Sequence, residues 1–286
     1  MKTKAFYDTQ TSTVTYVVHD PATRDAVIVD PVLDLDPVAW RTSTRSVDEV
    51  VKYVEEHGLS VHYVLDTHAH ADHLTGMALL SETLGARTGI GEGIVGLQKN
   101  VANMFNNDDA VTDGSQWDVL LADGQELAAG SMTITAMHTP GHTPACMSYF
   151  IDGAVYVGDA LFMPDYGTGR CDFPGGSAED MFESVSEKLY GLPDDTRVFV
   201  GHDYRPGGRD AAWETTIGAS KEGNVRLRGT TERQTFVAAR KARDAELNAP
   251  ALIMPSLQVN MEAGRLPARE SNGRRYLRIP LNLLGL

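Results

Sequence analysis

The sequence has few cysteines, no long apolar run and fewer basic than acidic residues. Cys146 and Cys171 are the only cysteines among 286 residues, which excludes a disulfide-rich scaffold and suits a reducing compartment. The first eight residues have no apolar stretch of signal-peptide length, and no later run is long enough to span a bilayer. Lys and Arg number 25 against 39 Asp and Glu, a net charge of -14, so we expect no nucleic-acid partner. These features predict a cytoplasmic protein that binds neither nucleic acid nor membrane.

The remaining composition is that of a globular protein. Hydrophobic residues make up 42% and charged residues 22%, and the length suits one large domain or two modest ones. Apolar periodicity predicts regular elements in two β-rich halves. In the first half we expect strands at 13–18, 26–30 and 61–65 and helices at 47–57, 73–84 and 93–105, with Asp72 as the N-cap of the second helix.

The second half repeats this pattern. We expect strands at 119–121, 131–137, 146–151, 154–157 and 197–200, a helix at 177–189, and a loop at 162–176, where Gly, Pro and Asp are frequent. Two β-rich halves packed face to face with helices outside make an α+β fold, an αββα sandwich. We expect this domain to cover 1–205. A C-terminal extension at 206–286 would pack on it, with a helix at 231–247 and a strand at 276–281.

Histidine and aspartate residues gather where the predicted strands end. Residues 67–73 read Thr-His-Ala-His-Ala-Asp-His, and three later strand ends carry Pro-Gly-His, Gly-Asp and Gly-His. Imidazole and carboxylate groups are ligands of Zn, Fe and Mn, and burying so many of them without an ion would be costly. The seven candidate ligands are His68, His70, Asp72, His73, His142, Asp159 and His202.

The spacing of the first cluster suggests two neighbouring ion positions. His68 and His70 are two residues apart, so in an extended segment both would grip one ion from the same side. Asp72 and His73 follow where the chain turns, and they would face a second ion.

Two further residues are candidate hydrogen-bond partners of the ligand histidines. Asp66 lies just before the first cluster, and His138 lies four residues before His142. Basic residues between 221 and 243 form a strip that either steers an anionic thiol towards the protein or belongs to solvated helix faces.

The order of these motifs resembles the metallo-β-lactamase superfamily, which includes thioester hydrolases, β-lactamases, nucleases and sulfur dioxygenases. Over about residues 13–205 the chain is more specifically similar to the persulfide dioxygenases, non-haem iron enzymes that oxidise glutathione persulfide to sulfite and glutathione. Three stretches carry this resemblance: Gly158-Asp159-Ala160-Leu161-Phe162, Gly169-Arg170-Cys171-Asp172-Phe173 and Gly201-His202-Asp203-Tyr204. The resemblance implies a metallo-β-lactamase fold with one Fe(II) per chain, and a persulfide and O₂ as substrates.

The resemblance also implies roles for individual residues. It places the iron on His68, His142 and Asp159, a set that leaves positions open for O₂ and a sulfur donor. The other four candidate ligands, His70, Asp72, His73 and His202, would then be hydrogen-bonding groups around the iron. For a pair of ions, it assigns His142 to the first ion and His202 to the second, with Asp159 between them.

The sequence departs from the familiar glutathione-dependent enzymes at 163–169, which is longer than their Arg-Gly-Cys-Gly stretch. We therefore expect a different wall of the substrate pocket. Arg170, Tyr204 and Arg205 are candidate substrate contacts, because a guanidinium group binds a carboxylate in a fork. Cys171 either relays a persulfide or packs beside the loop.

Two other functions remain open. The same ligands suit a binuclear hydrolase of glutathione thioesters, similar to glyoxalase II. Such a site lowers the pKa of bound water, which then attacks the thioester. Its metals would be Zn(II), one or two per chain, or a Zn/Fe pair. A non-enzymatic protein with a structural metal is disfavoured, since cysteines usually close such sites. The stretch 255–260 is apolar enough to pack on the main domain or on a second subunit, so a homodimer is among the expected assemblies.

Overall fold

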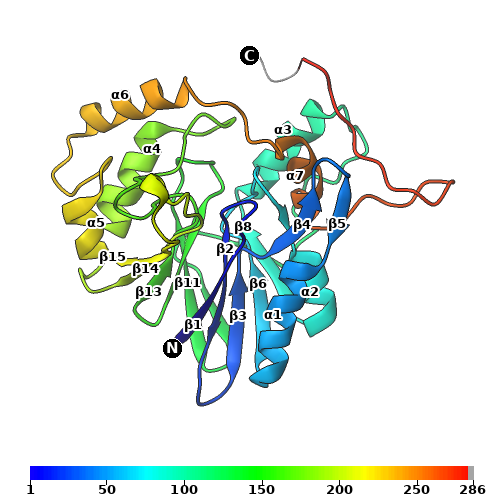
Figure 1. Ribbon diagram of the computed structural model, residues 1–286, viewed down its shortest axis with the longest axis horizontal. Helices are drawn as coiled ribbons and strands as arrows, with labels where there is room; N and C mark the ends of the chain where they lie inside the picture. The colour runs from blue at the N-terminus through cyan, green and yellow to red at the C-terminus, as the bar shows by residue number, and fades with distance from the viewer. Residues whose placement is uncertain (283–286) are drawn as a thin grey trace.

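The structure, a computed structural model, describes residues 1–282. Within these residues, two six-stranded sheets pack against each other and helices cover their outer faces (Figure 1). The predicted αββα sandwich of the α+β class is therefore confirmed.

The first sheet has the strand order β1-β2-β3-β6-β8-β9. Its first three strands are antiparallel, whereas β3, β6, β8 and β9 run parallel to one another. The strands are β1 (Lys2–Tyr7), β2 (Val14–His19), β3 (Asp25–Val29), β6 (Ser60–Leu65), β8 (Arg87–Gly91) and β9 (Val119–Leu121). Apolar residues of α1 (Arg45–Glu56), α2 (Met77–Leu84) and α3 (Ile94–Met104) pack on its outer face.

The second sheet has the order β10-β11-β12-β13-β14-β15 and is antiparallel except where β13 meets β14. The strands are β10 (Glu126–Ala129), β11 (Met132–His138), β12 (Met147–Ile151), β13 (Ala154–Tyr156), β14 (Arg197–Phe199) and β15 (Glu214–Thr216). Its outer cover consists of α4 (Ala178–Glu183), a π-helical turn (Ser184–Leu189), α5 (Ile217–Gly223) and α6 (Arg233–Asp244).

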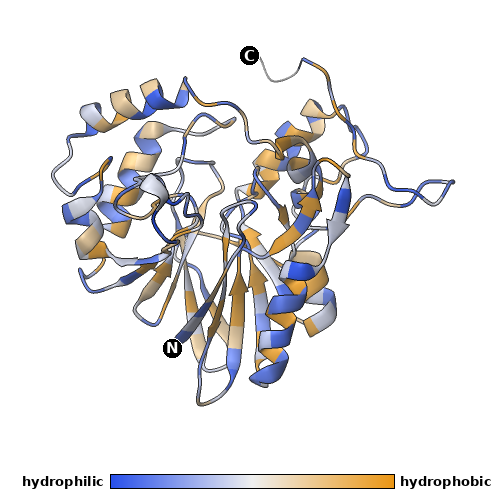
Figure 2. Cartoon of the chain, viewed as in Figure 1, coloured by the Kyte–Doolittle hydropathy of each residue, from blue (hydrophilic) through white to orange (hydrophobic). Residues whose placement is uncertain are grey.

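Successive side chains of a strand point to opposite faces of the sheet, which explains how each sheet packs on the other sheet and on its helices at once. In β2 every residue is buried, with Val17 facing the helices and Tyr16 facing the other sheet. A strand covered on both faces is largely apolar, as are four of the six residues of β2. Figure 2 shows the same division, with apolar strands in the middle and helices that turn polar faces outwards.

A small third sheet, β5-β4-β7, lies beside the sandwich and corrects one prediction. It contains β4 (Val32–Asp36), β5 (Arg41–Ser43) and β7 (Leu74–Thr75). Because β7 pairs with β4, the helix predicted from His73 begins only at Met77, with Gly76 as its N-cap. The prediction that Asp72 caps this helix was therefore wrong.

Residues after 205 contribute to the sandwich as well as covering it. After a short 3-10 turn (Pro206–Gly208), β15 completes the second sheet, and α6 packs on α4. A helix that we had not predicted, α7 (Ile253–Asn260), lies beside β7, whereas the strand expected at 276–281 does not form. The boundary at residue 205 stays a prediction. No helix within residues 1–282 has the length and apolar character needed to cross a membrane.

Replacing Ile28 by Ala tests the core. Ile28 is fully buried in the layer between the first sheet and its helices, so its truncation should lower the free energy of unfolding by about 2–5 kcal/mol. Chemical denaturation measures this loss. Val38→Ala, at a side chain that is 90% exposed, should change it by less than about 0.5 kcal/mol. Equal effects of the two substitutions would contradict the assigned packing.

Candidate metal centre

All seven candidate ligands lie on segments that follow the ends of strands at one rim of the sandwich. His68 comes shortly after β6, His142 after β11, Asp159 after β13 and His202 after β14. The strands fix where each segment leaves the sheet, and the irregular backbone that follows turns the side chain inwards. Residues far apart in sequence therefore meet at this rim.

The first group consists of His68, His142 and Asp159, whose ligand atoms all lie within 4.8 Å of one another. His142 Nδ1 lies 2.8 Å from the backbone oxygen of Arg170. A carbonyl can only accept, so Nδ1 carries the proton and Nε2 keeps its lone pair. That lone pair is 3.5 Å from Asp159 Oδ2.

His68 has the same tautomer for a related reason. The Thr67 hydroxyl donates its one hydrogen to Asp30 Oδ2 at 2.9 Å, so it accepts the Nδ1–H of His68 at 3.0 Å. His68 Nε2 is then unprotonated. Two imidazole lone pairs and one carboxylate therefore converge in the first group.

The second group consists of His70, Asp72, His73 and His202, again with ligand atoms within 4.8 Å of one another. Asp159 lies between the groups, because its Oδ1 is 3.3 Å from His202 Nε2 while its Oδ2 faces the first group. This is the bridging place that the family resemblance implied.

His70 does not join the first group, contrary to the expectation that it would share an ion with His68. The backbone at 67–73 is irregular and not extended, so side chains two residues apart need not point the same way. His70 Nε2 lies 3.1 Å from Asp30 Oδ1, and its ring is thereby turned towards the second group.

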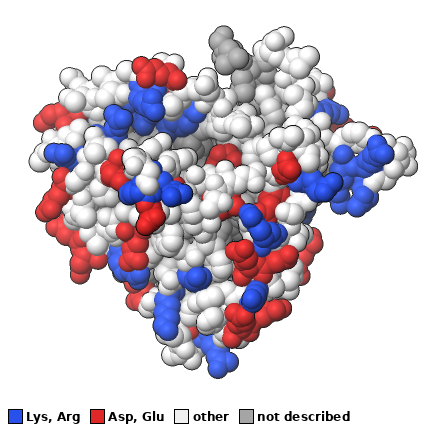
Figure 3. Space-filling model, viewed as in Figure 1, with Lys and Arg blue, Asp and Glu red and all other residues white. Residues whose placement is uncertain are grey.

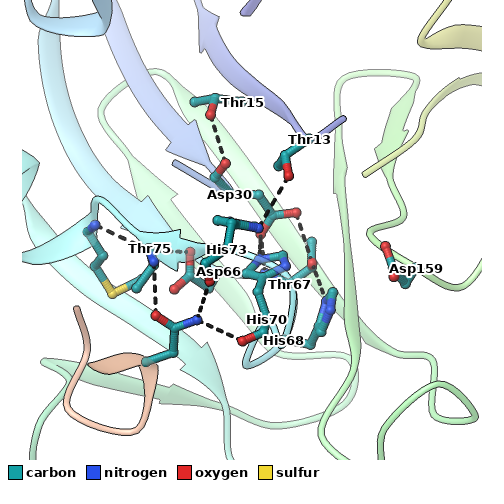
Figure 4. A network of polar contacts seen from close by, with 12 residues as sticks. Thr13, Thr15, Asp30, Asp66, Thr67, His68, His70, His73, Thr75 and Asp159 are labelled. Carbon is teal, nitrogen blue, oxygen red and sulfur yellow. Dashed lines mark hydrogen bonds and ion pairs between the residues drawn. The ribbon is translucent and has the colours of Figure 1, made fainter. Parts of the chain in front are cut away.

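Asp30 holds this loop, and sequence analysis missed it. Its carboxylate accepts from the Thr67 amide at 2.6 Å, as well as from the Thr67 hydroxyl and from His70 (Figure 4). Burial raises the pKa of Asp30 to about 6. The only sign of this role in the sequence is its place directly after a buried strand; the structure adds a left-handed φ of 50°.

Asp66 and His138, which the sequence suggested as hydrogen-bond partners of the ligand histidines, make other contacts. Asp66 accepts a hydrogen bond from the Thr75 hydroxyl at 3.0 Å. His138 Nε2 lies 2.8 Å from the backbone oxygen of Pro144, so it closes the loop that contains His142 and does not contact a ligand ring. Both residues therefore support the backbone near the ligands.

The two groups fit a metal cofactor, because their buried atoms need a cation. Among the described residues, six such atoms make no hydrogen bond: His68 Nε2, His70 Nδ1, Asp72 Oδ2, His73 Nε2, Asp159 Oδ1 and His202 Nε2. Each unsatisfied polar atom costs roughly 1–3 kcal/mol. Burial also lowers the pKa of His68 and of His70, so both rings are neutral near pH 7. Metal coordination would satisfy all of these atoms at once.

A cleft of about 670 Å³ leads to Asp72, His142 and Asp159. Of the predicted substrate contacts, Arg170 and Tyr204 line it, but Arg205 is not among the described residues that do. The Arg170 guanidinium bonds Asp172 and the backbone oxygen of Asn248. The Tyr204 ring stacks on His202 at 5.7 Å between centroids.

The basic strip is not merely a solvated surface. Arg226, Arg240 and Arg243 line the same cleft, and Arg240 is buried. Figure 3 shows Lys and Arg gathered near α6 and again on the C-terminal loop that projects at the right, on a surface that otherwise mixes both charges.

Both cysteines are free and buried. Burial raises the pKa of Cys146 to about 12 and moves the pKa of Cys171 further upwards. A thiol without thiolate character is a poor nucleophile, so the packing role of Cys171 is favoured over a persulfide relay.

Paired histidine and aspartate groups at the rim of an αββα sandwich define a metal-dependent enzyme. The sequence profile of the metallo-beta-lactamase superfamily matches residues 8–202. The chain belongs to this superfamily.

Relatives with different names resemble the chain. It is 48% identical over 281 residues to the beta-lactamase hydrolase-like protein of Agrobacterium fabrum, covering 98% of this chain but only 65% of that protein's length. It is 41% identical to glyoxylase B2 of Dictyostelium discoideum, over 99% of this chain and 98% of that one. Human mitochondrial persulfide dioxygenase ETHE1 is 30% identical over 203 residues, 70% of this chain and 68% of the relative. The crystal structure of ETHE1 from Myxococcus xanthus matches with a TM-score of 0.74 and 32% identity, over 93% of this chain and 100% of that one.

Replacing Asp30 by Asn tests its support of the ligands. The change removes the carboxylate that orients His70, and loss of such a partner typically weakens metal binding about 10–100-fold. Competition with a chromophoric chelator measures the dissociation constant.

Asp34→Asn is the matched control. Asp34 is also a buried aspartate, but it accepts hydrogen bonds from Arg45 and Ser46. An equal loss of metal affinity in both variants would contradict a specific role of Asp30.

Proposed function

We propose that the protein is a non-haem Fe(II) persulfide dioxygenase that oxidises glutathione persulfide, or a related low-molecular-weight persulfide, with O₂ to sulfite and a thiol. One Fe(II) per chain would bind His68, His142 and Asp159. The observation that supports the proposal is the orientation of His70: its ring lies 4.1 Å from that of His68, but its Nε2 faces Asp30 and its ligand atom belongs to the second group. The similarity to the ETHE1 proteins supports it.

Two histidines and one carboxylate occupy one face of an ion and leave the remaining positions open. Fe(II) in such a site supplies the O₂ chemistry that side chains cannot perform. With His70 held by Asp30, the first group offers only three protein donors, and the cleft reaches two of them, His142 and Asp159.

The protein's own residues would bind and shield the substrate. Phe173 packs edge-on against His142, with 5.0 Å between ring centroids, and Phe162 contacts both His202 and Tyr204. These rings exclude water from the inner cleft. The side chains of the second group would border the iron and offer their free polar atoms to the substrate or to water, without a second ion.

The cleft also favours an anionic substrate. In a chain of net charge -14, three arginines line it: Arg226, Arg240 and Arg243. The guanidinium of buried Arg240 already pairs with Asp244 and donates to the backbone oxygen of Thr168, so Arg226 and Arg243 would supply the charge that meets a ligand. A persulfide that carries a carboxylate matches these donors. We propose Tyr204 and Arg170 as further contacts, and Arg205 as a contact at the rim outside the cleft.

A binuclear hydrolase of glutathione thioesters is the second candidate. The four unsatisfied ligand residues of the second group favour it, and so do the names of the Agrobacterium and Dictyostelium relatives. Zn(II), or a Zn/Fe pair, would then occupy both groups, with Asp159 shared between them.

Metal analysis combined with an oxygen electrode distinguishes these functions. Anaerobically purified protein should contain close to one iron per chain and consume O₂ when glutathione persulfide is added. His142→Ala and Asp159→Ala should lose iron, and their activity should fall at least ~100-fold. This loss is larger than that expected from replacing an outer partner of a ligand, because both variants remove a direct metal ligand.

His62→Ala provides the control, since His62 pairs with Asp25 and not with the site. If the protein instead contains two zinc ions per chain and hydrolyses a thioester without O₂, the dioxygenase proposal is wrong and the hydrolase is the function.

Arg243→Gln tests the anionic substrate. Losing one charge-assisted hydrogen bond should raise KM for glutathione persulfide about 10-fold and leave kcat unchanged. A persulfide without a carboxylate should show no change. Arg228→Gln is the control, because Arg228 is exposed and is not among the described residues that line the cleft. Equal KM changes for both persulfides would disprove carboxylate recognition.

A further inference from the structure

The loop that carries four of the candidate ligands has little regular structure of its own. Between β6 and α2, only Leu74 and Thr75 form strand pairs, yet the loop from Thr67 to His73 is largely buried. Buried backbone N–H and C=O groups need partners. In an irregular segment those partners must come from elsewhere in the chain.

Asn260, the last residue of α7, supplies three of them. Its Nδ2 donates to the backbone oxygens of His70 at 2.7 Å and of His73 at 2.8 Å, and its Oδ1 accepts from the Thr75 amide at 2.9 Å. Asn260 is only 2% exposed. Figure 4 shows His70, His73 and Thr75 together on the side of the network away from Asp159.

The end of α7 is itself fixed in place. Gln98 of α3 donates to the backbone oxygen of Met261 at 3.0 Å and accepts from the Gly114 amide at 3.0 Å. Gly264 follows with φ +82°, and a Cβ there would lie 2.8 Å from the backbone oxygen of Thr75. The chain after α7 therefore lies directly against the ligand loop.

We propose that Asn260 is a positioning residue of the metal centre. By holding the carbonyls of His70 and His73, it sets the direction of two imidazoles of the second group. The residue lies outside the matched residues 8–202, so this proposal makes the C-terminal part of the chain a component of the site. It rests on the metal site and holds for either reaction, dioxygenation or hydrolysis.

The chemistry of the side chain explains why an amide is needed. Both amide hydrogens and the amide oxygen are used, and no other side chain of this length offers two donors beside an acceptor. An aspartate at this position would keep the shape, but it would set a carboxylate oxygen against two carbonyl oxygens. The substitution Asn260→Asp is therefore the most direct probe.

The experiment titrates chelator-treated protein with Zn(II) in competition with a chromophoric chelator. Asn260→Asp should bind zinc about 10–100-fold more weakly, the usual effect of losing an outer partner of metal ligands. Co(II) absorption spectra, recorded in parallel, should show altered coordination. Neither readout depends on catalytic activity.

Val259→Ala is the matched control, because Val259 is the neighbouring residue, is fully buried in α7 and makes no side-chain hydrogen bond. It should lower the melting temperature by leaving a cavity but keep wild-type zinc affinity. Wild-type affinity in Asn260→Asp, or an equal loss in Val259→Ala, would reduce Asn260 to a packing residue.

Gly264→Ala decides the matter if Asn260→Asp does not fold. The added methyl group would press on Thr75 and displace the same loop, so zinc affinity should again fall, and unchanged affinity would overturn the proposal. If the variants lose zinc affinity but the wild-type protein takes up no O₂ with a persulfide, the role of Asn260 stands and only the proposed dioxygenase activity is disproved.

Discussion

The rest of the structure depends on one constraint: imidazole and carboxylate atoms are buried at the rim of the sandwich without hydrogen-bond partners in the described chain. Their combined desolvation cost is comparable to the whole stability of a domain, roughly 5–15 kcal/mol. Metal ions bound at the two groups would offset this cost. The strands bring the ligands together, and the surrounding loops are built to hold them in that unfavourable arrangement.

The division of the ligands between two groups bears directly on the chemistry. The same seven side chains suit a mononuclear iron site or a binuclear hydrolase site, so their identity alone does not distinguish the two. Asp30 turns the free nitrogen of His70 towards the second group, and Asp159 lies between the groups. A hydrogen bond that one buried carboxylate accepts thus changes how many metal ligands the first position offers.

The C-terminal part of the chain is joined to the site at two places. The arginines of α6 line one wall of the cleft, and Asn260 at the end of α7 holds the ligand loop. Cys171, which sequence analysis considered as a relay thiol, is buried among the residues that pack behind the cleft. The wall of the cleft thus contributes charge and shape.

The sequence by itself determined the sandwich and the list of candidate ligands, because alternating apolar residues and short motifs at strand ends are local patterns. It also placed helices such as α1 and α6 to within a few residues. Only the tertiary structure decided that Asp30 holds His70, that Arg240 lies buried in the cleft and that Asn260 binds the ligand loop. These partners are 40 to 190 residues apart in sequence. A hydrogen bond across such a distance leaves no periodicity in the sequence, since it depends on where the folded elements pack.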